Sequence, residues 1–82
     1  MKYLVKKTYT ALRSNEHFEK GYTETWYSGK NRSDKELCGW IIEDGYTRKH
    51  FVEKKIQDDK DFEKRMGQDF WKIDYEIIEI EG

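Results

Sequence analysis

The sequence predicts an α+β domain in which one helix covers one face of a three- to four-stranded, mainly antiparallel sheet, in the order β-β-β-α-β. Three observations support this prediction. Residues 70–81 alternate between apolar and polar side chains, residues 48–66 follow the helical period, and residues 2–28 hold two strand-like runs separated by turn residues. A helix and a sheet that are each apolar on one side bury those sides against each other.

The N-terminal 28 residues predict a β-hairpin. Residues 2–12, "KYLVKKTYTAL", and residues 22–28, "YTETWYS", are rich in the Tyr, Val, Thr and Trp that strands favour. Residues 13–21 supply the turn residues between them. Strand alternation places Tyr3, Val5 and Tyr9 on one face of the first strand and Leu4, Thr8 and Thr10 on the other.

The next two segments predict a loop and a third strand. Residues 29–35, "GKNRSDK", contain no apolar residue, so we expect a loop. Residues 37–42, "LCGWII", form a short apolar run bounded by turn residues, which favours a buried strand. A run of this length does not by itself exclude a helix.

The stretch "EDGYTRKHFVEKKI", residues 43–56, could be either a hairpin around Asp44 and Gly45 or a turn that begins a helix. The residues after Gly45 do not alternate as a hairpin requires, so the helix is favoured. Thr47 is a suitable N-cap, and Gly67 is a typical helix end. Tyr46 and Phe51 occupy the positions of a hydrophobic staple around that cap. The pattern therefore predicts a helix over residues 48–66.

The face that this helix turns to the sheet follows from an advance of about 100° per residue. Five apolar residues fall in one arc: Phe51, Val52, Ile56, Phe62 and Met66. Asp59 falls inside the same arc, and "QDDKD" is poor helix-forming sequence because Asp competes for backbone hydrogen bonds. A break, with Asp58 or Asp59 capping a second short helix, is the alternative.

The C-terminal segment "FWKIDYEIIEIE" predicts the last strand. Trp71, Ile73, Tyr75 and Ile77 face one way, and the residues between them are charged. The phase slips at Ile77 and Ile78, after which Ile78 and Ile80 continue the apolar face. A β-bulge is the simplest cause of such a slip, so we expect one there.

Composition limits the class of protein. The chain has 82 residues, so we expect a single domain over residues 1–82. Charged residues make up 40% of it, but 3 Trp, 6 Tyr and 4 Phe favour a folded domain over a disordered one. The sequence shows no signal peptide and no apolar run of membrane-spanning length, and Cys38 is the one cysteine. These features predict a cytoplasmic protein in a reducing compartment.

The residue types that carry catalysis are not arranged for it. His17, Cys38 and His50 lie far apart and match no zinc-binding spacing. Cys38 sits in an apolar run, and the glycines do not form a phosphate-binding loop. We therefore expect no catalytic residues, no metal and no cofactor.

The charge distribution suggests two binding surfaces. Residues 1–35 hold eight Lys or Arg and four Asp or Glu, together with several aromatic rings. Rings that stack on bases, with cations near phosphates, would grip single-stranded nucleic acid. The candidate residues for such a surface are Lys6, Lys7, Tyr9, Tyr22, Trp26 and Tyr27. If instead the first and last strands are neighbours, Lys2 and Lys6 would form cross-strand ion pairs with acids of residues 74–81.

The second candidate surface is acidic. Asp58, Asp59 and Asp61 form a cluster that could dock on a basic patch of another protein. A solvated helix face explains the same cluster without a partner.

The segment "GWIIEDGYTRKHFVEKKI", residues 39–56, resembles a strand-turn-helix segment of small uncharacterised proteins from Gram-positive bacteria and their phages. It is also similar to the strand-to-helix turn of the small DNA-binding domains of phage-type integrases, although those domains are usually basic and this chain has a net charge of −1. The resemblance implies a phage or mobile-element setting.

Together these observations predict a small non-enzymatic binding module, a phage or mobile-element regulator or inhibitor that docks on a host protein. One alternative is a nucleic-acid-binding module that uses the basic, aromatic hairpin. Another is a structural homo-oligomer assembled through an open sheet edge.

Overall fold

The structure, a computed structural model, describes residues 1–81 and contains a four-stranded antiparallel sheet in the order β3-β2-β1-β4. The predicted α+β class and the β-β-β-α-β order of the main elements are confirmed. The elements are β1 (Lys2–Ala11), β2 (Thr23–Ser28), β3 (Ser33–Asp34), α1 (Gly39–Glu43), α2 (Lys49–Met66) and β4 (Trp71–Ile80).

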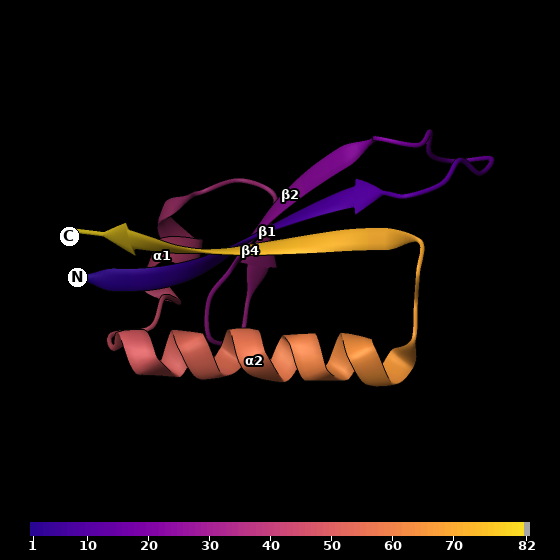
Figure 1. Ribbon diagram of the computed structural model, residues 1–82. Helices are drawn as coiled ribbons and strands as arrows, with labels where there is room; N and C mark the ends of the chain where they lie inside the picture. Colours follow the sequence, from indigo (N-terminus) through magenta and orange to yellow (C-terminus); the bar gives the residue numbers. More distant parts are fainter. Residues whose placement is uncertain (82) are drawn as a thin grey trace.

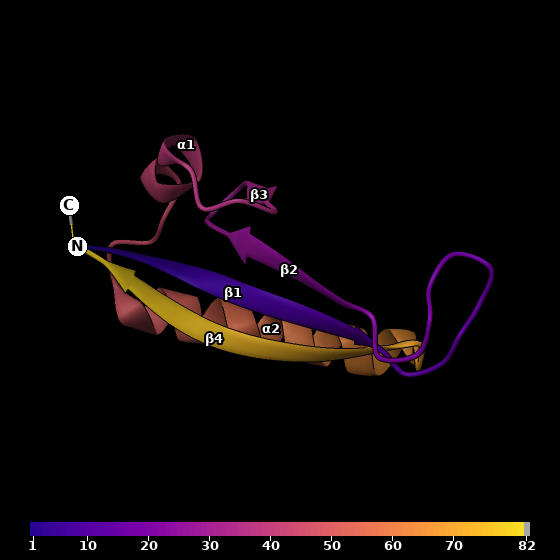
Figure 2. The same ribbon diagram turned by 90° about the horizontal axis from the view of Figure 1, so that it is seen from above.

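The sheet is covered on one face by α2, which runs beneath β1 and β4 along the strand direction (Figure 1). The short helix α1 lies beside β1, beyond the end of β2 (Figure 2). β1 is an interior strand, paired with β2 on one side and with β4 on the other. The predicted N-terminal hairpin is thus present, and the first and last strands are neighbours.

The pairing of β1 with β4 is continuous from Lys2 opposite Ile80 to Ala11 opposite Trp71. The predicted β-bulge at Ile77 and Ile78 is therefore wrong. Ile77 lies opposite Val5 and Ile78 opposite Leu4, so these two isoleucines point to opposite faces. Leu4 and Val5 are both fully buried, which means that this end of the sheet is covered on both sides. The phase slip reflects a second buried face rather than an extra residue.

The predicted strand at residues 37–42 is also wrong. Gly39–Glu43 forms α1, in which Ile41 is fully buried, and the third strand is Ser33–Asp34 inside the predicted loop. That strand pairs with the end of β2 across a tight turn, in which the Gly29 N–H donates to the Arg32 carbonyl at 2.9 Å. A strand that follows after four intervening residues is easier to reach than one across a longer loop, so the local hairpin occupies this edge of the sheet.

Asp44 joins the turn before α2 to the turn between β2 and β3. One of its carboxylate oxygens accepts hydrogen bonds from the N–H groups of Asn31 and Arg32, at 2.8 and 2.7 Å. The Lys30 N–H donates to the Asp44 carbonyl at 2.9 Å. Gly29 allows this approach, because a Cβ there would lie 2.6 Å from the Asp44 carbonyl oxygen. The sequence predicted that residues 43–46 are not the turn of a β-hairpin, and they are not. These residues instead connect the turn before α2 to the turn between β2 and β3.

The helix α2 is continuous, so the predicted alternative of a break at Asp58 or Asp59 is wrong. It begins one residue later than predicted, with Arg48 rather than Thr47 at the N-cap position and no side-chain cap. It ends as predicted at Gly67, whose φ of 68° is left-handed and whose N–H donates to the Glu63 carbonyl.

The rotation of α2 about its own axis differs from the prediction. Val52 is fully buried and Ile56 half-buried, but Phe51, Phe62 and Met66 are 48%, 52% and 65% exposed. The residues of α2 that face the sheet include Asp59 in place of these three apolar residues. The prediction that all five share the buried face is therefore wrong, because α2 instead turns Asp59 toward the Lys7 ammonium of β1.

Truncating a buried residue and truncating an exposed one should have different effects on stability. Leu4→Ala should lower the free energy of unfolding by about 2–5 kcal/mol, because it leaves a cavity at a fully buried site. Met66→Ala, at an exposed site, should change it by less than about 0.5 kcal/mol. Urea unfolding followed by circular dichroism measures both, and equal losses would contradict this description of the core.

A second prediction concerns Asp44. Asp44→Ala should lower the free energy of unfolding by about 1–3 kcal/mol, because two backbone N–H groups lose their acceptor. Asp44→Asn keeps a carbonyl oxygen for those donors and should cost less. The same urea titration compares the two variants, and an Asp44→Ala protein as stable as the wild type would show that the junction is dispensable.

Candidate functional site

An ion pair lies at the centre of the contact between α2 and the sheet. The Lys7 ammonium in the middle of β1 is 2.8 Å from one carboxylate oxygen of Asp59, and the two side chains are only 16% and 22% exposed. Lys55 approaches the other oxygen at 3.7 Å. The Asp59 oxygen next to Lys7 is shut off from water and makes no well-directed hydrogen bond. The positive charge of Lys7 thus offsets the cost of burying the Asp59 carboxylate.

Two tyrosines border this ion pair. Tyr75 on β4 has the ammonium groups of Lys7 and Lys60 at 5.9 and 5.6 Å from its ring centre. Burial, reinforced by the charges of Asp59 and Glu63, raises the pKa of Tyr75 to about 12. Burial and the same two carboxylates, Glu63 first, also raise the pKa of Tyr9. Both phenols therefore stay neutral at physiological pH.

A hollow of about 190 Å³ lies beside this centre. It is lined by residues of α2, β4 and their connection: Lys60, Glu63, Gln68, Trp71, Ile73 and Tyr75. No residue of β1 or β2 lines it, so it lies at the β4 side of the helix, below the edge of the sheet. Its walls are aromatic and apolar on the strand side and polar on the helix side.

The strand above this hollow is an edge of the sheet. Within residues 1–81, β4 pairs with β1 and with no other strand. The Leu12 N–H donates to the Phe70 carbonyl, so even-numbered residues of this segment direct their backbone groups toward β1. Odd-numbered residues of β4 therefore direct their N–H and C=O groups outward.

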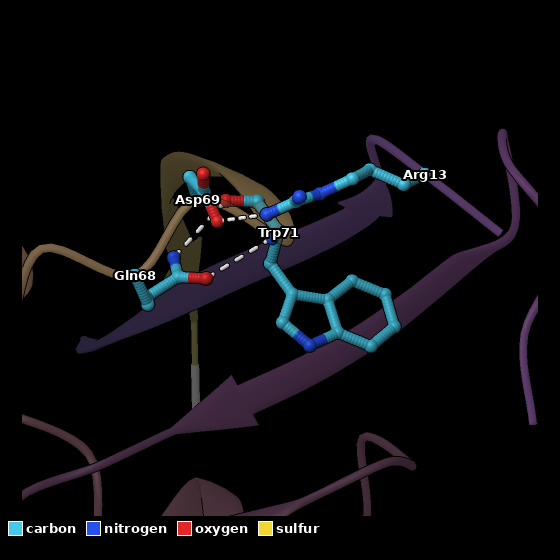
Figure 3. Close-up of polar contacts among 4 residues, drawn as sticks. All are labelled: Arg13, Gln68, Asp69 and Trp71. Atoms are coloured by element: carbon cyan, nitrogen blue, oxygen red, sulfur yellow. Dashed lines mark hydrogen bonds and ion pairs between the residues drawn. The ribbon is translucent and has the colours of Figure 1, made fainter. Parts of the chain in front are cut away.

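At Trp71 these outward groups are bonded by a side chain (Figure 3). The Trp71 N–H donates to the Gln68 side-chain oxygen at 3.0 Å, and the Gln68 side-chain amide donates to the Trp71 carbonyl at 3.1 Å. Arg13 and Asp69 form an ion pair at the same corner (Figure 3). Gln68 thus ends the open edge, which runs from Ile73 to Glu79.

An aromatic cluster holds this corner in place. Trp71 packs edge-on against Phe18 and Phe70, with ring centres 5.1 and 5.0 Å apart, and Phe18 lies 5.0 Å from Tyr22. These contacts connect the loop between β1 and β2 to the start of β4. They orient the indole that forms one wall of the hollow.

The residues predicted to bind nucleic acid lie on two faces of the sheet and in its end loop. Lys6 pairs in register with Tyr27 on one face, and Lys7 pairs with Trp26 on the face of α2. Tyr9 shares the face of Lys7, and Tyr22 belongs to the aromatic cluster. The six residues therefore do not form one stacking platform.

Several of these side chains have partners within the chain. Lys6 lies opposite Glu76 with 3.9 Å between the charged groups, as the cross-strand interpretation requires. The Lys35 ammonium lies 5.4 Å from the Trp26 ring centre and 2.6 Å from Glu24. The hydrogen bond that Lys35 donates to the Glu24 carboxylate raises the pKa of Lys35.

The predicted acidic cluster is also divided. Asp59 points into the contact with the sheet, whereas Asp58 and Asp61 are exposed. Asp61 accepts a hydrogen bond from the Gln57 side chain at 3.0 Å. Lys60 and Gln68, which line the hollow, are not among the residues predicted from the sequence. A glutamine three residues before a strand was the one signal that could have indicated the edge cap.

In residues 1–81 no three His, Cys, Asp or Glu side chains are grouped as a metal site would need. No helix in that range combines the length and apolar character needed to cross a membrane. Comparisons of the chain gave no matching family model, no match among curated proteins and no match among solved structures.

The tyrosines give a prediction for alkaline pH. Tyr75 keeps its proton in the folded state up to a pKa of about 12, whereas an unfolded tyrosine loses it near 10. The folded state then binds more protons than the unfolded state between these pH values, so stability should fall as pH rises from about 10 to 12. Tyr75→Phe should reduce this loss.

Ultraviolet absorbance at 295 nm during an alkaline titration checks the same group. The wild type should show tyrosines that titrate later than the exposed ones, and Tyr75→Phe should remove the step near pH 12. Urea unfolding at several pH values measures the stability change. A variant that keeps the late step would show that another tyrosine produces it.

Proposed function

We propose that the protein is a non-enzymatic binding module that docks on another protein and thereby regulates or inhibits it. The observation that carries the proposal is the open edge of β4 directly above the hollow between β4 and α2. Unpaired backbone groups beside a recess are the two features with which a sheet recognises a segment of another chain.

Edge strands in proteins that have no partner are usually short, kinked or covered. β4 has ten residues, pairs with β1 without interruption, and has no helix lying outside it in either view (Figures 1 and 2). Its charged residues lower the tendency to aggregate but do not block its outward backbone groups. This combination supports an edge that receives a partner.

The sequence resemblance of residues 39–56 to segments of small phage and Gram-positive bacterial proteins favours a host protein as the partner, although Gly39–Glu43 forms a helix here and not the strand of that resemblance. A small module with a dense charged surface and a recess beside an open strand suits occlusion of a surface on a larger protein. In this proposal inhibition results from steric blocking and requires no catalytic group.

An affinity capture from a Gram-positive bacterial lysate tests the proposal. The tagged protein should retain a defined host protein, and nuclease treatment should leave that retention unchanged. Phe62→Ser is a control that changes the side of α2 away from the hollow. Phe62 is 52% exposed and lies nearly opposite Lys60, which lines the hollow. Its capture should match that of the wild type.

Two results would contradict the proposal. Material that disappears on nuclease treatment would instead indicate nucleic-acid binding. Beads that retain no protein above an untagged control, from lysates of several hosts, would also count against docking.

A further inference from the structure

We infer that the partner contributes an extended segment that pairs with β4 as a fifth strand, and that this segment alternates apolar and basic residues. The inference rests on the proposed docking function and specifies the chemistry of the partner. It follows from the backbone, the recess and the charge of the same edge.

The backbone sets the length of the segment. Ile73, Tyr75, Ile77 and Glu79 direct their N–H and C=O groups outward. Residues that bond to a neighbouring strand recur every second position, so these four residues span seven positions. A partner strand of about seven residues would satisfy them all.

Gln68 shows that this edge accepts a partner and where the partner must stop. Its side-chain amide both donates to and accepts from Trp71, at 3.1 and 3.0 Å, as a residue of an adjacent strand would (Figure 3). A strand added to β4 therefore meets Gln68 at Trp71 and cannot extend further without displacing it.

The recess selects an apolar side chain. Side chains of an added strand on the α2 side point toward the hollow, because alternate residues of neighbouring strands share a face. Trp71, Ile73 and Tyr75 form its strand wall. A cavity of about 150 Å³ holds benzene, so a hollow of about 190 Å³ can accept one Leu or Phe side chain.

The opposite face selects basic side chains. Asp74 and Glu76 are exposed there, and Lys6 approaches Glu76 only at 3.9 Å. Residues 73–82 contain four acids and no Lys or Arg. Lys or Arg directly across from these carboxylates would form favourable cross-strand pairs.

A second copy of the chain fits this edge poorly. Two β4 strands would bring acids against acids. Asp74 and Glu76 are exposed on the same face of β4, so an antiparallel pair would set these carboxylates against their counterparts in the other copy.

The experiment uses the synthetic peptide acetyl-Lys-Val-Lys-Leu-Arg-Val-Lys-amide as the probe. Hydrogen exchange by NMR should slow about tenfold or more at the outward amides of Ile73, Tyr75, Ile77 and Glu79 when the peptide saturates the protein. The inward amides, already bonded to β1, should change little. A peptide with Glu in place of each Lys and Arg should give no protection.

Three variants locate the contact. Glu79→Pro removes one outward N–H and should weaken peptide binding, whereas Glu79→Ala removes the same carboxylate and keeps that N–H. The difference between the two isolates the backbone bond. Gln68→Ala exposes the backbone groups of Trp71, so peptide protection should extend to that amide.

The inference is wrong if the basic peptide fails to protect the outward amides or if the acidic peptide protects them equally. Outward protection that rises with protein concentration, without peptide, would identify a second copy as the occupant and overturn the inference. A host protein captured equally by the wild type and by Glu79→Pro would refute the fifth strand but leave the docking function standing. An empty capture refutes the docking function whatever the peptide does.

Discussion

The Lys7–Asp59 ion pair is the interaction on which the arrangement of α2 depends. A lysine in the middle of a central strand, under a helix, needs a nearby acid because an unpaired buried charge is costly. Asp59 provides that acid at 2.8 Å. The helix is rotated to allow this contact, and the rotation turns Phe51, Phe62 and Met66 toward solvent.

The same contact shapes the edge of the sheet. With Asp59 and Glu63 turned inward, the space between α2 and β4 is bordered by charged and phenolic groups rather than filled by large apolar ones. A hollow remains there, below a strand whose outward backbone groups are bonded, within residues 1–81, at Trp71. The recess beside the proposed binding edge therefore results from a charged pair between helix and sheet, at a position that apolar side chains fill in most small domains.

Burial on both sides of β1 explains the rest of the core. Leu4 and Val5 are adjacent in the chain and fully buried on opposite faces. Ile77 and Ile78 on β4 follow them in register. A sheet covered on one face would show strict alternation, so the consecutive apolar residues mark the end at which both faces are covered. A bulge and a second buried face give the same local pattern, and only the position of the neighbouring strand separates them.

The sequence by itself determined the elements that depend on local preference and period. These are the β1–β2 hairpin, the alternation of Trp71 to Ile77, and a helix that ends at Gly67. The tertiary structure alone decided which side of α2 meets the sheet, which residues form the third strand and where the edge remains open. The apolar arc of α2 indicated one rotation, but pairing of Lys7 with Asp59 across 52 residues of chain imposed another. Gln68 and Lys60 acquire their roles only from the strand beside them, because a hydrogen bond or a recess requires two segments that the chain brings together on folding.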